Sequence, residues 1–302
     1  MQISREAINV PLGQSFRLIR WTRSVNAVEN LLADGSAVPS TGEGGHWHYH
    51  PEMELTLFTE GCGNRFVGDH IGAFGAGDLI LLGSMLPHHW HSERPTGGLS
   101  LQWNFPSHHP LLELPETELL RSLFQRASRG LHLSGSAREQ AARQMGALAG
   151  ASALVRLGRL LELLATIANA PPEEVAPLAT ACFVPPTDET YQKSISRVLR
   201  HLVVNFREAI ALDEMLELSR MSRPTFVRQF KRHTGRSMSE FLIELRLQAA
   251  CRELLDTECR ILEIAMSCGF SQISFFNRVF RRVMGCSPMA FRLHERGRQN
   301  TI

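Results

Sequence analysis

The sequence lacks the features that mark membrane-spanning and secreted proteins. No apolar run approaches the roughly 20 residues that a bilayer-spanning helix needs, and residues 1–5 carry no apolar signal-peptide core. No two of the six cysteines form a Cys-x-x-Cys pair. They are Cys62, Cys182, Cys251, Cys259, Cys268 and Cys286. We therefore expect a cytoplasmic protein with no membrane association, whose thiols are reduced and structural.

A strong overall charge is also missing, but the charge that is present is unevenly distributed. The chain has 302 residues and a net charge of +2. Residues 188–302 contain 19 Lys and Arg against 13 Asp and Glu, whereas residues 1–187 contain 13 against 17. A positive final third suits a polyanionic partner, although a solvated basic surface would give the same surplus. The length and the 43% hydrophobic content are sufficient for two packed domains.

A faint internal repeat lies within the basic region. The segment that begins Phe226-Val-Arg228-Gln-Phe230 recurs fifty residues later as Phe276-Asn-Arg278-Val-Phe280. Gly235 and Phe241 recur with the same offset as Gly285 and Phe291, whereas upstream the offset slips by one residue. The sequence therefore predicts two tandem copies of one small helical unit, with one extra residue in the turn of the second copy.

Each copy separates an apolar face from a polar, cationic face. Phe276, Phe280 and Val283 fall at helical spacing, while Gln272, Ser274, Arg278 and Arg281 project elsewhere. We expect a short leading helix over 261–268 and a turn at Gly269-Phe270, with Ser271 as N-cap of the next helix. The first copy has the same plan, with a leading helix over 213–218 and Ser222 as N-cap. Helix, tight turn and cationic helix is the pattern that places side chains in a DNA major groove.

At this point the chain resembles an AraC/XylS-type transcription regulator. The residues that carry the resemblance are Gly269-Phe270-Ser271, Phe275-Phe276, Arg278, Phe280-Arg281, Gly285 and Ser287-Pro288. The resemblance implies two helix-turn-helix units, at about 212–233 and 261–283, within a DNA-binding domain over 188–302. A long helix over 239–255 would join them and hold the two recognition helices roughly 34 Å apart, one DNA turn.

The resemblance also implies which side chains meet DNA. Base contacts would come from Arg223, Thr225, Val227 and Arg228 of the first recognition helix and from Gln272, Ser274, Asn277 and Arg278 of the second. Phosphate contacts would come from Lys231, Arg232, Arg281 and Arg282. Arg228 and Arg278 occupy equivalent positions, so they could instead brace the fold.

The first 110 residues have a different pattern. Short β-type runs at 16–22, 53–59, 79–82 and 98–105 are separated by turns that contain glycine and proline. The spacing of His48, His50 and Glu54, followed by His88, resembles a cupin metal site. His48 and His50 share one face of a strand, and an N3O ligand set suits Zn, Ni, Mn or Fe. Pro51 can reset the strand alternation on which the position of Glu54 depends.

Three alternatives remain open for this cluster. The residues could bind a divalent metal, satisfy core hydrogen bonds, or hold a polar organic effector such as a sugar without metal. In the last case the pocket would be lined by His48, His50, Glu54, His88, Trp47, Trp90 and Trp103. His89, His91, His108 and His109 are expected at the surface or the rim.

Between the two domains, residues 111–170 follow helical periodicity. The leucines of 119–124 and 154–164 predict a helical pair that packs on the barrel, or a dimer interface as the resemblance would imply. The proline-containing residues 171–187 then read as an interdomain linker. The expected architecture is therefore α+β in two domains, a cupin-like barrel over 1–110 and an all-α domain over 188–302.

The sequence thus predicts a non-enzymatic regulator that binds promoter DNA, responds to a small molecule and forms a homodimer, with RNA polymerase as a further partner if it is an activator. No catalytic residue is assigned and no cofactor is required, although a divalent metal fits. The alternative is a metal-dependent cupin enzyme fused to a DNA-binding domain, because residues 1–110 could hold a catalytic metal ion. Residues 1–110 contain no nucleophile pairing that would support catalysis without metal. Whether the regulator activates or represses does not follow from the sequence.

Overall fold

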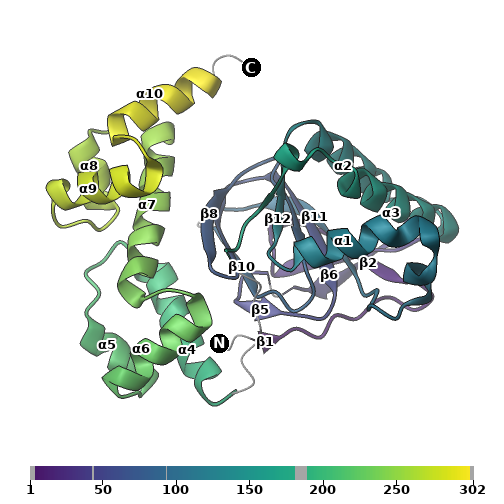
Figure 1. Ribbon diagram of the computed structural model, residues 1–302, viewed down its shortest axis with the longest axis horizontal. Helices are drawn as coiled ribbons and strands as arrows, with labels where there is room; N and C mark the ends of the chain where they lie inside the picture. Colours follow the sequence, from purple (N-terminus) through teal and green to yellow (C-terminus); the bar gives the residue numbers. More distant parts are fainter. Residues whose placement is uncertain (1–3, 43, 93, 181–188, 300–302) are drawn as a thin grey trace. The chain divides into compact units, whose positions relative to one another are not determined.

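The computed structural model describes residues 4–42, 44–92, 94–180 and 189–299. The chain divides into two compact units, an N-terminal unit that ends at residue 187 and a C-terminal unit that starts at residue 188 (Figure 1). The N-terminal unit contains the strands and the C-terminal unit is helical, so the α+β, two-domain prediction is confirmed. Among the described residues, no helix is long and apolar enough to cross a membrane.

The N-terminal unit is built on two sheets. One has five strands in the order β1-β5-β10-β7-β8 and the other has eight, in the order β13-β12-β9-β6-β11-β2-β3-β4. The strand bounds are β1 Ser4–Arg5, β2 Phe16–Ser24, β3 Ala27–Leu31, β4 Ala37–Thr41, β5 His48–Tyr49, β6 Met53–Glu60, β7 Gly63–Val67, β8 His70–Phe74, β9 Leu79–Leu82, β10 His88–His91, β11 Gly97–Trp103, β12 Leu131–Leu133 and β13 Val175–Pro177. Among the described strands, none pairs with both sheets. The expected barrel is therefore an open two-sheet sandwich.

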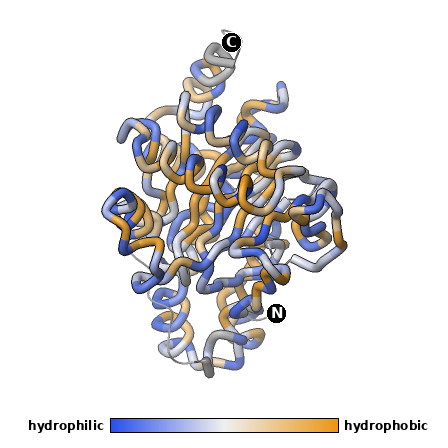
Figure 2. Tube along the Cα trace, turned by 90° about the vertical axis from the view of Figure 1, so that its right-hand side faces the viewer, coloured by the Kyte–Doolittle hydropathy of each residue, from blue (hydrophilic) through white to orange (hydrophobic). Residues whose placement is uncertain are grey.

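Strand alternation gives this unit two separate cores. Leu55 and Leu57 of β6 join the core beneath the helices, whereas Phe58 joins the core between the sheets. In the same way Leu79 and Leu81 of β9 face the helices, and Ile80 and Leu82 face the opposite sheet. Central segments are hydrophobic and peripheral loops hydrophilic in Figure 2. The central strands β6 and β9 of the eight-stranded sheet are thus buried on both faces, and the inner face of the sheet also carries polar side chains.

Three helices, not the expected two, cover the outer face of the eight-stranded sheet (Figure 1). They are α1 Glu118–Ala127, α2 Gly135–Ala147 and α3 Ala153–Ala168. Short 3-10 turns η1 Pro110–Glu113 and η2 Pro115–Thr117 precede α1, and η3 Pro172–Glu174 follows α3. Helix α2 lacks a leucine stripe and buries the small side chains of Ala137 and Ala141 with Met145. Leucine periodicity therefore does not reveal it.

The predicted start of the interdomain linker, residue 171, is too early in the sequence, because the N-terminal unit continues beyond it. Strand β13 pairs with β12, which itself pairs with β9, so residues 175–177 form one edge of the large sheet. The Glu174 carboxylate accepts hydrogen bonds from the backbone N–H groups of Ser136 and Ala137 at the start of α2. The prolines at 171, 172 and 177 thus belong to the N-terminal unit, and Pro185 and Pro186 lie outside the described residues.

The C-terminal unit contains seven helices among the described residues. They are α4 Glu189–Asn205, α5 Leu212–Ser219, α6 Arg223–Thr234, α7 Met238–Asp256, α8 Ile261–Ser267, α9 Ile273–Met284 and α10 Pro288–Gln299. Helices α6 and α9 end at Gly235 and Gly285 with φ of +76° and +72°, the left-handed conformation that glycine adopts without strain. The pairs α5–α6 and α8–α9 agree with the predicted units at 212–233 and 261–283.

The turn of the second unit carries the extra residue that the repeat predicted. In the first unit, left-handed Arg220 lies three residues before α6, and in the second unit left-handed Gly269 lies four residues before α9. Because of this residue, the N-cap of α9 is Gln272 and not Ser271 as expected. Ser222 is the N-cap of α6, as predicted.

Candidate nucleic-acid interface and histidine cluster

Helix α6 buries its aromatic side chains and exposes its predicted DNA-contacting ones. Phe226 and Phe230 are buried, whereas Arg223, Val227 and Arg228 are exposed. A shallow hollow on this helix is lined by Arg223, Pro224, Val227, Arg228, Lys231 and Arg232. Thr225 is half-buried and its hydroxyl accepts a hydrogen bond from Ser222 at 3.0 Å. The structure therefore gathers five of the six predicted first-helix residues on one cationic surface.

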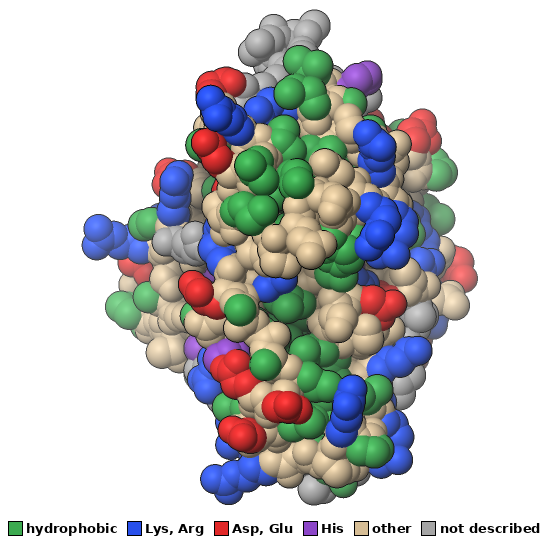
Figure 3. Space-filling model, turned by 90° about the vertical axis from the view of Figure 1, so that its left-hand side faces the viewer, with side chains coloured by type: hydrophobic (Ala, Val, Ile, Leu, Met, Phe, Trp, Pro, Cys, Tyr) green, Lys and Arg blue, Asp and Glu red, His purple; other side chains and the backbone are tan. Residues whose placement is uncertain are grey.

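Helix α9 repeats this arrangement. Phe276, Val279 and Phe280 are buried. Val283, expected in the core, is 41% exposed, because i, i+3, i+4 spacing selects Val279 instead. Gln272, Ser274, Arg278, Arg281 and Arg282 are exposed and Asn277 is half-buried. Figure 3 views the molecule from the left of Figure 1 and shows lysine and arginine side chains spread over this side, with hydrophobic and some acidic side chains between them.

The two equivalent arginines both lie at the surface. Both Arg228 and Arg278 are exposed, and no described side chain forms an ion pair with either. The Arg278 guanidinium lies over the Phe275 ring at 5.4 Å from its centroid, a contact that leaves its N–H groups free. Exposure on a cationic face favours a DNA contact over a structural role.

Side-chain bonds fasten the first helix-turn-helix unit to the second. Arg246 of α7 donates to the backbone carbonyls of Phe206 and Glu208, each at 2.7 Å. Arg207 donates to Glu253 at 2.6 Å and to the Ser267 carbonyl at 3.1 Å. These bonds connect the segment between α4 and α5 with the long helix and with the end of α8. No sequence motif pointed to a role for these residues.

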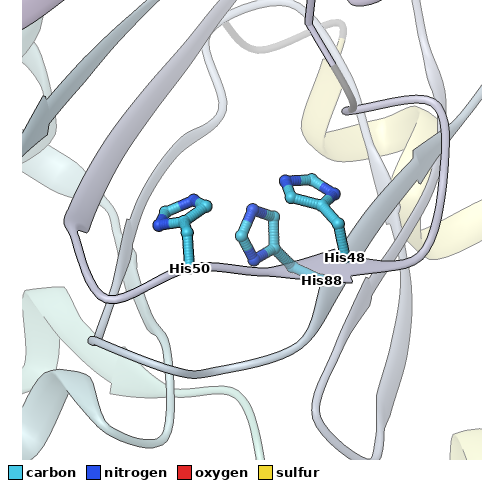
Figure 4. A group of neighbouring side chains, drawn as sticks. All are labelled: His48, His50 and His88. Carbon is cyan, nitrogen blue, oxygen red and sulfur yellow. The ribbon is translucent and has the colours of Figure 1, made fainter. Parts of the chain in front are cut away.

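The N-terminal unit brings the predicted histidines together. His48, His50 and His88 are each about 1–2% exposed, and one ring nitrogen of each lies within 4.8 Å of the others. Their imidazoles lie side by side in Figure 4. His48 and His88 come from paired positions of β5 and β10, and His50 follows β5 directly. The sequence spacing thus accounts for His48 and His50, and the pairing of β5 with β10 adds His88 to the set of potential ligands.

One nitrogen of each ring is already engaged by a backbone carbonyl. Nδ1 of His48, His50 and His88 lies 2.8, 3.0 and 2.9 Å from the carbonyl oxygens of His46, Glu52 and Leu86. A carbonyl only accepts hydrogen bonds, so each Nδ1 carries a proton, and a ring with its only proton there has a lone pair on Nε2 for a metal ion. Metal-binding histidines are oriented in this way.

Glu54 faces the same point, as predicted despite Pro51. Its Oε2 lies 3.2 Å from His50 Nε2 and 3.7 Å from His88 Nε2. It accepts hydrogen bonds from Gln102 at 2.8 Å and from Thr56 at 2.5 Å. The chain bends at Pro51 between β5 and β6, and this bend brings His50, which directly follows β5, close to Glu54 of β6.

Electrostatics around the cluster favour a cation at its centre. Burial lowers the pKa of His48 well below its ordinary value, and the imidazoles of His88 and His50 lower it further. Burial alone would raise the pKa of Glu54, but the facing rings of His50 and His88 hold it well below its ordinary value. A metal ion at the centre of the cluster would add a positive charge that faces the Glu54 carboxylate and the Nε2 atoms of His50 and His88.

Charged residues to which no sequence motif pointed surround the cluster. Glu6 Oε2 lies 3.3 Å from His48 Nε2 and Glu52 Oε2 lies 3.7 Å from His50 Nδ1. Arg17 is 3% exposed and interacts with Glu6, Glu52 and Glu54. With neutral histidines, three carboxylates and one guanidinium leave a formal charge of −2. Strand alternation could have identified Arg17 and Gln102. Arg17 lies two residues from Ile19, and Gln102 lies two residues from Ser100, so each pair shares the inner face of its strand.

Two of the three tryptophans assigned to the same pocket lie elsewhere. Trp103 packs under the helices, with its ring centroid 6.3 Å from that of Phe124. Adjacent residues on a strand point to opposite faces, so Trp103 and Gln102 of β11 face opposite sides of the sheet. Trp47 contacts Phe66 and His89. Trp90 alone of the three helps to line the cavity beside His48 and Glu54. That cavity has a volume of about 30 Å³, the space of roughly one water molecule.

His89 is not the surface residue that was expected. It is 8% exposed and stacks on Phe66 at 5.1 Å, and burial lowers its pKa to about 3. His109, in contrast, accepts a hydrogen bond from the Leu111 backbone at the start of η1. His91 is half-buried and His108 is exposed.

Comparisons with known proteins identify the C-terminal unit. Residues 215–294 match the family model described as a helix-turn-helix domain. The HTH-type transcriptional activator RhaS of Escherichia fergusonii is 32% identical over 105 residues, which are 35% of this chain and 38% of that protein. RhaS of Pectobacterium carotovorum is 25% identical over 81% of this chain and 86% of that protein.

Among solved structures, the DNA-binding domain of AdpA in complex with a target DNA is 30% identical, with a TM-score of 0.35. It covers 35% of this chain and 96% of that domain. The chain spans less than two fifths of the length of the first curated relatives that it matches. The residues that match the family model all lie within the C-terminal unit.

Proposed function

Since its C-terminal unit is an AraC-family helix-turn-helix domain, we propose that this chain is a bacterial transcription regulator that binds promoter DNA and responds to a small molecule. The observation that carries the proposal is the repeated cationic helix, α6 and α9, each glycine-capped and each with its aromatic side chains buried. A regulator of this kind acts in the cytoplasm, where promoter DNA is found. The relatives RhaS and RhaR are transcriptional activators, and RNA polymerase would be a second macromolecular partner if this chain is an activator as well.

The two recognition helices would read two successive major grooves. Arg228 and Arg278 are the side chains suited to bidentate bonds with guanine, and Gln272 and Asn277 suit adenine. Lys231, Arg232, Arg281 and Arg282 would contact phosphates and set the register. Helix α7, with Arg246 and Arg207, would hold the two helices at a fixed spacing.

DNA footprinting with the full chain tests this proposal. The Arg228→Ala, Arg278→Ala double variant should lose at least about 100-fold in affinity for the chain's own promoter, because two base contacts are removed. An Arg126→Ala, Arg143→Ala double variant, which removes two exposed arginines of the N-terminal unit, is the control. Equal affinity of the recognition-helix variant and the wild type would refute the assignment.

We further propose that the histidine cluster binds one divalent metal ion. The cluster offers three imidazole Nε2 atoms, whose Nδ1 atoms are hydrogen-bonded to backbone carbonyls, and one carboxylate. These ligands and the formal charge of −2 suit a borderline ion such as Zn, Ni, Mn or Fe. His48, His50, His88 and Glu54 would hold it. Bound there, the ion would neutralise the buried carboxylates and tie β5 to β6 and β10.

The second candidate function, a metal-dependent enzyme, rests on the same cluster. Such an enzyme needs an open coordination position that a substrate can reach. The adjoining cavity of about 30 Å³ offers room for a water molecule and not for an organic substrate. The geometry therefore favours a sensor or stabilising role for the ion, and we propose that the chain is not an enzyme.

Elemental analysis of purified, tag-free protein tests the metal proposal. The wild type should contain close to one metal ion per chain, and His50→Ala should lose it. His108→Ala, at an exposed position, is the control and should retain the metal. Metal absent from all three proteins would leave the cluster as a buried hydrogen-bond network and would remove the basis of the enzyme alternative.

A further inference from the structure

A second pocket in the N-terminal unit is large enough for an organic ligand. Its volume is about 530 Å³, within the range of roughly 300–1,000 Å³ typical of small-molecule sites. It lies where the bend at Pro51, the loop after β9, the end of β11 and helix α1 meet. The lining residues are Pro51, Met53, Ser84, Asn104, Phe105, Pro106, Ser107, Leu112, Arg121, Phe124, Gln125 and Ser128.

The walls of this pocket combine an apolar floor with a polar rim. Met53, Phe105 and Leu112 are buried and belong to the core beneath the helices, against which half-buried Phe124 packs. The exposed amides of Asn104 and Gln125 lie at the rim. Apolar atoms dominate the lining, so the ligand needs an apolar body with a polar end.

Arg121 defines the charge of that polar end. The residues that line the pocket include no aspartate or glutamate. The Nη2 group of Arg121 donates to the carbonyl oxygen of Leu112, which fixes the guanidinium at the pocket wall. Its Nε lies 3.6 Å from Glu118, whose side chain is 81% exposed, so solvent screens that pair. The remaining N–H groups suit a carboxylate.

The position of the pocket connects two parts of the unit. Pro51 directly follows His50 of the histidine cluster, and the backbone N–H of Met85, next to Ser84, donates to the His50 carbonyl at 2.8 Å. On the other side, α1 packs against α3 through the core that they share. A ligand here would contact both the bend that carries His50 and the helical layer.

We propose that this pocket, and not the interior of the sheet sandwich, binds the effector, and that the effector is a small organic carboxylate with an apolar body. The inference rests on the proposed regulator function and assigns its ligand to a site separate from the metal cluster. The cavity beside His48 is too small for such a molecule, whereas the pocket at Arg121 accommodates one.

Isothermal titration calorimetry with the full chain tests this site. The probes are straight-chain carboxylates of six to ten carbons at up to millimolar concentration, with 1-octanol as the uncharged analogue. At least one carboxylate should bind saturably, and Arg121→Gln should weaken it by about 10-fold or more, because a charge-assisted hydrogen bond is lost. Arg126→Gln on the same helix, which does not line the pocket, should leave binding unchanged.

Two outcomes would overturn the proposal: no saturable binding of any carboxylate, or equal binding by Arg121→Gln and wild type. Octanol binding that is insensitive to Arg121 would support the assigned role of the guanidinium. Promoter binding by the ligand-free protein is measured in parallel. Its failure would contradict the regulator function, whereas its success without carboxylate binding would contradict the pocket alone.

Discussion

Backbone carbonyls determine the chemistry of the three central histidines. Each carbonyl fixes a proton on the Nδ1 atom of its ring, and the three Nε2 atoms then converge beside a carboxylate. The residue types and their spacing point to His48, His50 and Glu54, but the tethering carbonyls of His46, Glu52 and Leu86 leave no trace in a sequence pattern. Residue-scale predictions therefore follow from the contacts around the cluster.

Gln102 should tune metal affinity without binding the ion. Its amide donates to Glu54 Oε2 at 2.8 Å and orients the carboxylate. Gln102→Ala should weaken metal binding by about 10-fold, a typical effect of removing such a partner. Competition with a fluorescent chelator measures the change. Gln144→Ala, whose amide bonds to an exposed glutamate on α3, should retain wild-type affinity.

The cysteines should differ widely in reactivity. Burial raises the pKa of Cys251 and of Cys268 to about 12, whereas Cys259 is exposed. At pH 7.5 we expect iodoacetamide to modify Cys259 at least about 100-fold faster than Cys251, because the thiolate is the reactive form. Peptide mass spectrometry measures the rates. Rapid modification of Cys251 in the folded protein would contradict its buried placement.

At the scale of the element, the two recognition helices are alike for two reasons. Their apolar residues have the same spacing, and each helix ends at a glycine. Phe226 and Phe230 pack as Phe276 and Phe280 do. The apolar spacing and the terminal glycines predicted both helices closely. The start of α9 was missed by one residue because Ser and Gln both precede it, and backbone geometry decides which of them is the N-cap.

The long helix α7 begins with a capping box that should contribute to stability in a pH-dependent way. Ser237 and Glu240 exchange hydrogen bonds at 2.8 and 3.3 Å. Glu240→Ala should lower the free energy of unfolding of the C-terminal unit by about 1 kcal/mol at pH 7. Ser239→Ala, one position before Glu240 and outside the box, should have a smaller effect.

Acid should remove this contribution. The backbone N–H and hydroxyl of Ser237 hold the pKa of Glu240 below its ordinary value of 4.5. A depressed carboxyl pKa stabilises the fold above the ordinary value, and the stabilisation is lost as the pH falls through the lowered value. Urea unfolding of the wild type and of Glu240→Ala between pH 7 and pH 3 should therefore show that their difference in free energy of unfolding becomes smaller below about pH 4.5. A constant difference would exclude the carboxylate as its source.

At the scale of the whole molecule, oligomerisation depends on which part of α3 remains available. Leu160, Leu163, Leu164 and Ile167 are fully buried within their own unit, so most of the leucine stripe that suggested an interface is used internally. Leu154 is 80% exposed and Val155 48% exposed at the start of the helix. A homodimer, if it uses α3, therefore depends on these two side chains.

Leu154→Glu should weaken such a dimer. Loss of one buried leucine contact costs about 1.5–3 kcal/mol, which raises the dimer dissociation constant by about 10-fold or more. Analytical ultracentrifugation of the full chain measures it. Leu262→Glu, at an exposed apolar position on α8 of the other unit, is the control. An unchanged sedimentation coefficient across concentrations for wild type and variant would argue against a dimer through α3.

Local patterns in the sequence determined the two-domain division, the tandem units and their exposed cationic faces. These features depend on residues that are close in sequence, where helical periodicity, caps and glycine ends act directly. Helix α2 and strands β12 and β13 were missed because their residues gain stability only from the sheet and the core that they complete.

Tertiary structure alone decided the contents of the two cavities. Cross-strand pairing placed His88 opposite His48, and strand parity sent Trp103 to the helices and Gln102 to the carboxylate. The bend at Pro51 brought His50 and Glu54 together, and packing of α1 against the end of β11 formed the pocket beside Arg121. A sequence specifies which side chains are available, but which of them share a cavity depends on the register between distant strands.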